Sequence, residues 1–329
     1  MHHLADIRTL IFIALHLALA TFLILAFPYM ASWQVALGFA AMCFSCFVMA
    51  VIVHNTIHAP MFKSRALNKL TQMVLSVAQG HPMTAFVPGH NFSHHMHTLT
   101  TKDIMRPSQI NFRINLFNQL FFFFRVVPEI MDSERRWARK MRKENPAWFW
   151  QWVIENILVY TMRISLLVYS WKAAIIFVAI PHLYGHWGVV GANIYQHEGC
   201  VPNHKYNHSR TFTGWLLNWV LFNNGYHGAH HMAPTVHWTE LPAWHEKNVA
   251  PYVHPSLVHK SIIAYLFRSN IWPGKRVDLE GHEQRLTREP SADWIPDTDL
   301  LDRRTFMAQL GADPVDLAKL DEEASAQGA

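Results

Sequence analysis

The stretch from Val35 to His58, VALGFAAMCFSCFVMAVIVHNTIH, decides the fold. No residue from Val35 to Val53 is charged, and about 20 apolar residues in a helix are enough to cross a hydrocarbon core of ~30 Å. The stretch ends with His54 and His58, which lie four residues apart and therefore share one face of a helix. The sequence thus predicts a membrane-spanning helix that carries two imidazoles at one end.

Three further apolar runs predict that the chain crosses a membrane four times. The expected spans cover residues 10–29, 34–54, 149–170 and 173–195. Short connections near Pro28–Trp33 and Ser170–Lys172 join them into two hairpins. These connections hold one of the 28 Lys and Arg residues, whereas the segments outside the runs hold 26. By the positive-inside rule, both termini and segment 58–147 are expected in the cytoplasm, at a bacterial inner membrane or the endoplasmic reticulum.

The composition supports a membrane protein and excludes several other classes. Hydrophobic residues make up 51% of the chain and charged residues only 16%, which excludes a disordered protein. Three cysteines exclude a disulfide scaffold. A net charge of +5 is too small, and the basic residues are too widely spread along the chain, for a nucleic-acid partner.

The expected fold is therefore an all-α integral membrane protein with four transmembrane helices in two hairpins. Residues 1–273 are expected to form the membrane domain and residues 274–329 a polar cytosolic tail. The mixed stretches Ile110–Met131 and Ser256–Trp272 predict amphipathic helices that lie on the membrane surface. The apolar stretch 211–222 is too short to span.

The 23 histidines of the chain gather in four motifs: HNTIH at 54–58, HNFSHH at 90–95, NIYQH at 193–197 and HGAHH at 227–231. Helical spacing predicts that all three rings of the last motif converge on one place. In the second motif the first two rings should align, with the third rotated by about 100° and available for another metal. Neutral imidazole is a good ligand for iron, zinc, copper or nickel.

Topology predicts that these motifs meet on one side of the membrane. No span separates the first two motifs, and two spans separate the second motif from the motif at 193–197. An even number of crossings brings all of them to the cytoplasmic face, where they would form a histidine-box cap. If Ile110–Met131 were a fifth span, the motifs would be divided between the two faces.

The order HxxxH, HxxxHH and HxxHH around two membrane hairpins resembles the membrane-bound fatty acid desaturase superfamily. The resemblance covers about residues 35–250 and extends to the stretch 223–245, NNGYHGAHHMAPTVHWTELPAWH. It implies that two iron ions and O2 act on the cytosolic side, that Asn193 acts through water, and that no catalytic residue is needed beyond the metal ligands. The implied ligands are His54, His58, His90, His94, His95, His197, His227, His230 and His231.

Carboxylates near these ligands in sequence are candidates to hold the second N–H of an imidazole. Asp103, Glu198 and Glu240 fit this role, and a solvated loop charge is the alternative for each. Glu155 and Arg163 lie inside an apolar run, so we expect them to turn inward and to pair, either with each other or with another group.

The resemblance implies O2-dependent removal of hydrogen from an unactivated C–H bond. The leading hypothesis is a desaturase that acts on a fatty-acyl chain or a similar apolar substrate. A hydroxylase or other oxygenase of the same fold, acting on a lipid or small metabolite, is the alternative. Electrons must come from an external ferredoxin or cytochrome b5-like donor with its reductase, and the basic segment Arg135–Lys143 is either its dock or a membrane anchor.

Two other classes of protein explain the histidines less well. A divalent-metal transporter would need ligands in the middle of the bilayer, and a haem cytochrome would use His16, His182 or His186 but leave the boxes unexplained. Cys43 and Cys46 form a CxxC pair inside the second run. It is either a redox or metal pair or, as expected for a membrane helix, two small apolar residues.

Overall fold

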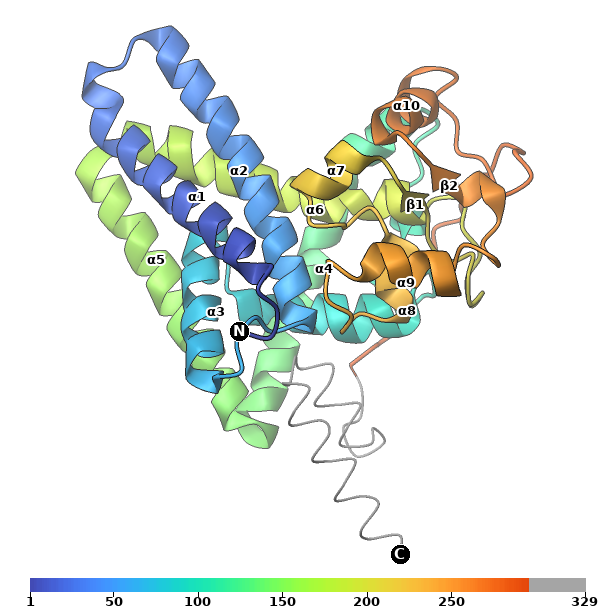
Figure 1. Ribbon diagram of the computed structural model, residues 1–329, viewed down its shortest axis with the longest axis horizontal. Coiled ribbons are helices and arrows are strands. Elements are labelled where there is room, and N and C mark those ends of the chain that lie inside the picture. The colour runs from blue at the N-terminus through green and yellow to red at the C-terminus, as the bar shows by residue number, and fades with distance from the viewer. Residues whose placement is uncertain (296–329) are drawn as a thin grey trace, which may run out of the picture. The chain divides into compact units, whose positions relative to one another are not determined.

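The computed structural model describes residues 1–295 of the chain, and the ribbon in Figure 1 shows a mostly helical protein. The chain divides into two compact units. The first unit comprises Met1–Phe86 and Ala138–Val189, and the second comprises Val87–Trp137 and, within the described residues, 190–295. Helices α4 (Asn115–Glu144) and α6 (Ile180–His197) run from one unit into the other.

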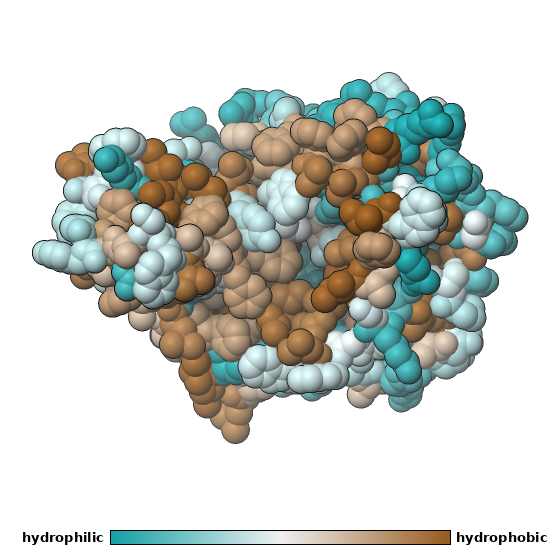
Figure 2. All heavy atoms as spheres, turned by 90° about the horizontal axis from the view of Figure 1, so that it is seen from above, coloured by the Kyte–Doolittle hydropathy of each residue, from teal (hydrophilic) through white to brown (hydrophobic). Residues whose placement is uncertain are grey.

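The first unit contains α1 (Asp6–Ala26), α2 (Ser32–His58), α3 (Arg65–Gln79), α5 (Pro146–Ala174) and the π-helical turn η5 (Ile175–Ala179). Among residues 1–295, three stretches of helix are long and apolar enough to cross a membrane: Asp6–Tyr29, Ser32–His58 and Pro146–His197. They include all four apolar runs of the sequence. The protein is therefore a helical membrane protein, and much of the face in Figure 2 is covered by apolar side chains, drawn in brown.

The third stretch is interrupted at Ser170, whose backbone is extended (φ −158°, ψ 92°). This break falls in the short connection Ser170–Lys172 expected between two spans. Beyond it, Ala173 and Phe177 pack in one apolar cluster with Leu23, Met42 and Cys46 of α1 and α2.

The two ionisable residues of α5 turn inward but do not pair with each other. Glu155 is fully buried and accepts hydrogen bonds from the backbone N–H of Thr84, its hydroxyl, and the Gln151 amide, at 2.8, 2.7 and 2.7 Å. Arg163 donates to the Gly80 carbonyl. Hydrogen bonds to polar groups thus replace the ion pair that the sequence allowed.

The second unit is assembled from short elements around a two-stranded parallel sheet. Strand β1 (Thr211–Phe212) pairs with β2 (Val258–His259). The unit also contains four short helices, labelled in Figure 1: α7 (Trp215–Val220), α8 (His227–Met232), α9 (Leu241–Asn248) and α10 (Ile262–Leu266). It further contains the π-helices η3 (Val87–His95) and η7 (Phe267–Ile271) and the 3-10 turns η4 (Pro107–Gln109) and η6 (Pro255–Leu257).

A close backbone approach places α8 against the sheet. The amide of Phe212 in β1 donates to the Gly225 carbonyl at 2.8 Å, just before α8 begins. A Cβ at Gly225 would lie only 2.3 Å from the Phe212 carbonyl oxygen, so only glycine fits there. The HGAHH motif therefore starts at a fixed point beside β1.

Helix α4 contains most of the predicted amphipathic segment Ile110–Met131 and extends well beyond its end. It begins at Asn115 rather than at Ile110 and continues to Glu144, with Pro128 inside. It buries Phe122 and Val126 against Ile194 and Ile110, while Phe117, Phe121 and Phe124 stay exposed. It is not one of the stretches apolar enough to span.

The part of the predicted tail that the structure describes, residues 274–295, belongs to the second unit and packs against its other elements. Arg106 donates to the Glu289 carbonyl at 2.6 Å, and the buried Trp294 stacks on Trp137 of α4 with centroids 6.2 Å apart. The other part of that tail, residues 296–329, lies outside the described residues.

Candidate metal centre

Four histidines from three separate elements of the second unit bring their ring nitrogens together. His94 comes from η3 and His197 from the last residue of α6, while His227 and His231 lie one turn apart on α8. One nitrogen from each ring lies within 4.8 Å of the others. We call these four side chains the four-histidine group.

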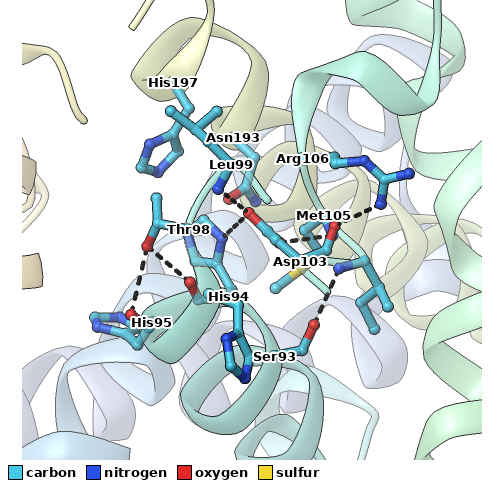
Figure 3. A network of polar contacts seen from close by, with 12 residues as sticks. Ser93, His94, His95, Thr98, Leu99, Asp103, Met105, Arg106, Asn193 and His197 are labelled. Atoms are coloured by element: carbon cyan, nitrogen blue, oxygen red, sulfur yellow. Dashed lines mark hydrogen bonds and ion pairs between the residues drawn. The ribbon is translucent and has the colours of Figure 1, made fainter. Parts of the chain in front are cut away.

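A buried carboxylate holds the His94 ring. Asp103 is fully buried, and its Oδ2 lies 3.0 Å from His94 Nδ1. The same carboxylate accepts from the backbone amides of Leu99 and Met105 at 3.0 and 2.9 Å (Figure 3). Because the carboxylate only accepts, Nδ1 of His94 carries the hydrogen and Nε2 carries the lone pair.

Oxygen atoms fix two more rings in the same tautomer. Nδ1 of His197 lies 2.8 Å from the His208 carbonyl, which can only accept. Nδ1 of His231 lies 3.2 Å from the Thr98 hydroxyl, whose own hydrogen is donated to the His94 carbonyl at 2.8 Å. His197 and His231 therefore also turn an Nε2 lone pair inward.

The inward nitrogens of the four-histidine group lie close to one another. Nε2 of His227 lies 2.9 Å from that of His197 and 3.0 Å from that of His231. Nε2 of His94 is buried and has no hydrogen-bond partner among the described residues. Burial lowers the pKa of His231 well below its ordinary value, and the neighbouring imidazoles lower it further. Converging neutral imidazoles suit a metal cation of the iron, zinc or copper type.

Backbone and side-chain contacts secure the end of α6 that carries His197. The buried Arg210 donates to the carbonyls of Tyr195 and Glu198 at 3.0 and 2.9 Å. The Arg210 amide donates to the Gln196 carbonyl at 2.7 Å. The last carbonyls of the helix, which have no partner within the helix itself, are thereby satisfied.

Three other predicted ligands of the second unit gather beside the four-histidine group. Nε2 of His95 lies 3.1 Å from Nε2 of His90, and the His95 and His230 ring centroids are 4.9 Å apart. One nitrogen from each of these three rings lies within 4.8 Å of the others. The His95 ring also stacks on that of His231, with centroids 4.2 Å apart.

The π-helical form of η3 changes which rings of the HNFSHH motif act together. An α-helix would align His90 with His94, as the spacing predicted. In a π-helix residues five apart are in register, so His90 faces His95 and His94 joins the other group. The prediction that all three rings of HGAHH converge on one place is also wrong, because His230 turns to His90 and His95.

The remaining two predicted ligands lie in the first unit, at the end of α2. His54 and His58 are buried, at 5% and 4% exposure, and their ring centroids are 5.9 Å apart. They share a helix face, as their spacing predicted.

The other candidate residues have different surroundings. Asn193, which is labelled in Figure 3, is buried and donates to the Val190 carbonyl at 2.9 Å. Glu198 pairs with the buried Arg276 at 2.9 Å and accepts from Asn115 rather than from a ligand imidazole. Glu240 is exposed at the beginning of α9.

Sequence reasoning missed Thr98 and His208 as neighbours of the four-histidine group. Thr98 lies three and four residues after the HxxxHH histidines and reaches His231, 133 residues away. The ring of His208 packs 5.4 Å from that of His231, and burial lowers its pKa to about 4. Only Thr98 had a local signal, because its spacing from His94 and His95 is helical.

Comparison with known proteins places these motifs in context. A family model described as fatty acid desaturase matches residues 31–261. Alkane 1-monooxygenase 1 of Alcanivorax borkumensis is 23% identical over 248 residues, which cover 70% of this chain and 58% of that protein. The matched region thus spans less than two thirds of the relative's length.

Proposed function

The chain belongs to the fatty acid desaturase family, and we propose that it is a membrane di-iron enzyme that hydroxylates an apolar chain with O2. The four-histidine group is the single observation that carries this proposal. Its inward nitrogens form a ready set of donors for a metal ion. The similarity to an alkane monooxygenase favours hydroxylation over desaturation.

The nine histidines of the boxes are the proposed ligands. In the second unit, two groups of ring nitrogens support two metal positions: His94, His197, His227 and His231 for one, and His90, His95 and His230 for the other. His54 and His58 are assigned to the metal set because they match the first box of the family. Asn193, four residues before His197, is proposed to act through a water molecule.

Bound iron would supply the activation of O2, which is the difficult step of the reaction. The residues of the chain fix the tautomer and orientation of the rings. Asp103, the Thr98 hydroxyl and the His208 carbonyl each engage an Nδ1 atom and leave an Nε2 lone pair for the metal. Such contacts to ligand imidazoles typically change metal affinity or activity by about 10–100-fold.

Four membrane crossings fit the described helices best. A straight helix of the 52 residues from Pro146 to His197 would be about 78 Å long at 1.5 Å per residue, more than twice a bilayer core of about 30 Å. The break at Ser170 divides it into two legs of suitable length. Phe27 and Phe177, one near each hairpin connection, are in edge-to-face contact at 5.8 Å, which supports connections on the same side.

With these crossings, both termini and the histidine boxes lie in the cytoplasm. An apolar substrate could then enter from the bilayer while electrons arrive from a soluble donor. We propose a ferredoxin or cytochrome b5-like protein with its reductase, and the basic segment Arg135–Lys143 as a candidate dock.

Oxidation of a medium-chain alkane and of a fatty-acyl substrate under 18O2 tests the proposal. The purified full-length protein is supplied with iron, a ferredoxin and its reductase, and the products are analysed by mass spectrometry. We expect an alcohol that carries one 18O atom. An unlabelled alkene as the sole product would instead establish the desaturase alternative, and no O2-dependent product from either substrate class would contradict the proposal.

A further inference from the structure

A separate cluster of potential metal ligands lies among the apolar helices of the first unit. His16 is near the middle of α1, Cys46 is near the middle of α2, and His182 is at the beginning of α6. One ligand atom from each lies within 4.8 Å of the others. All three are almost inaccessible, with exposed fractions of 2%, 1% and 3%.

Two glycines make the close approach of these side chains possible. A Cβ at Gly80, whose φ of +78° already favours glycine, would lie 2.0 Å from Nδ1 of His182. A Cβ at Gly185 would lie 2.8 Å from the Cys46 carbonyl oxygen, so α6 passes directly against α2. Any larger residue at either position would force the cluster apart.

The polar atoms around the cluster add donors to it. Nδ1 of His16 lies 2.8 Å from the Ser45 hydroxyl. Nδ1 of His182 is buried and has no hydrogen-bond partner within residues 1–295. Two imidazoles and a thiol therefore lie around one point.

Polar groups deep in membrane-spanning helices are costly to bury and generally have a function. We propose that His16, Cys46 and His182 bind a soft metal cation, Cu+, at a site separate from the histidine boxes. Thiolate and imidazole ligands favour Cu+ and Zn2+ over harder cations. Binding replaces the Cys46 thiol proton, which is released to solvent.

Charge balance distinguishes the two soft cations. Cu+ with one thiolate and two neutral imidazoles gives a site with no net charge, whereas Zn2+ leaves one positive charge. An uncompensated charge in an apolar interior is strongly unfavourable, so the surroundings favour Cu+. The bound ion would link α1 and α2, which are neighbours in the chain, to α6, which begins more than 100 residues later.

The CxxC pair provides a matched control for the experiment. Cys43 is also buried and is on the same helix, but it is not part of the cluster. Full-length protein in detergent, already loaded with iron, is titrated anaerobically with Cu+ in the presence of a competing chelator. Wild-type protein, Cys43→Ser, Cys46→Ser and His182→Gln are compared by metal analysis.

We expect wild-type protein and Cys43→Ser to retain about one copper per chain, and Cys46→Ser and His182→Gln to lose at least about nine tenths of it. Iron content should be the same in all four proteins, which separates this result from a failure of the di-iron proposal. Equal copper retention in Cys46→Ser and Cys43→Ser would overturn the proposal.

A second measurement does not depend on the folding of the Cys46 variant. In a Cys43→Ser, Cys200→Ser background, Cys46 is the one remaining cysteine. Copper X-ray absorption should then detect a sulfur ligand together with imidazole nitrogens. Copper bound by nitrogen and oxygen alone, or no copper retained against the chelator, would show that the cluster is only a hydrogen-bonded polar contact between helices.

Discussion

Replacing Asp103 with asparagine tests how the four-histidine group is held for metal binding. The carboxylate is fully buried and accepts three hydrogen bonds, from His94 Nδ1 and from the amides of Leu99 and Met105. Asparagine has nearly the same shape but only one acceptor oxygen. At least one of the three donors must therefore face an NH2 group instead of an acceptor.

The structure sets the size of the expected effect. If the asparagine oxygen keeps His94 and Leu99, the Met105 amide loses its acceptor, and a buried unsatisfied donor costs about 1–3 kcal/mol. The remaining bond to His94 is no longer charge-assisted and becomes weaker by about half. Metal affinity should fall by about 10–100-fold, or about 1.4–2.8 kcal/mol.

Iron affinity is measured by competition with a chelator in wild-type protein, Asp103→Asn and the control Asp132→Asn. Asp132 is a surface residue paired with Arg136, and its side chain is 64% exposed, so its replacement should leave iron affinity unchanged. Thermal unfolding of the metal-free proteins separates lost stability from lost affinity. Wild-type iron affinity in a folded Asp103→Asn protein would refute the proposed role of the carboxylate.

Three further predictions concern other contacts of the second unit. Thr98→Val should weaken iron binding by about tenfold, because the hydroxyl that orients the His231 ring is lost. Thr98→Ser keeps the hydroxyl and should bind iron with wild-type affinity, so equal iron affinity in the two variants would contradict this prediction. Arg276→Met should lower the free energy of unfolding by about 3–5 kcal/mol, because it leaves Glu198 buried without the cation that pairs with it. The control Lys275→Met, at an exposed ion pair, should lower it by less than about 1 kcal/mol. Thermal denaturation measures both losses, and similar losses would argue against a stabilising role of the buried pair. Burial lowers the pKa of His259 from 6.5 to about 4, so the unfolded chain binds more protons than the folded chain between these pH values, and the stability falls as the pH drops from 6.5 to 4. His259→Phe should make the free energy of unfolding depend less on pH in that window. An unchanged pH dependence would show that His259 does not contribute to it.

The fold class was predictable because its signals are local. Apolar runs and their connections are visible in the sequence, and the extended backbone at Ser170 lies in a connection that the charge pattern had indicated. The number of crossings stays a prediction, because three continuous helical stretches contain the four runs.

The grouping of the ligands was not predictable from α-helical spacing. The segment from Val87 to His95 winds as a π-helix, which pairs His90 with His95 and sends His94 to another set of rings. Such a change in helical winding depends on packing around the segment and leaves no periodic signature in the sequence.

Proximity in sequence was a poor guide to the carboxylates. Glu198 is adjacent to His197, yet its side chain lies with Arg276, which is 78 residues away. Asp103 is nine residues from His94 and contacts it directly. The backbone conformation between two residues, rather than their separation in sequence, decides whether their side chains are in contact.

The central claim is that the histidine boxes hold two iron ions, and iron content per chain tests it most directly. Full-length protein is purified in detergent after expression with iron, and iron and haem are quantified for wild-type protein, His94→Ala and the control His282→Ala, whose side chain is 80% exposed. We predict about two irons and no haem in the wild type and in the control, and less than about half of that iron in His94→Ala. Full iron loading of His94→Ala, or wild-type protein without iron, would contradict the account.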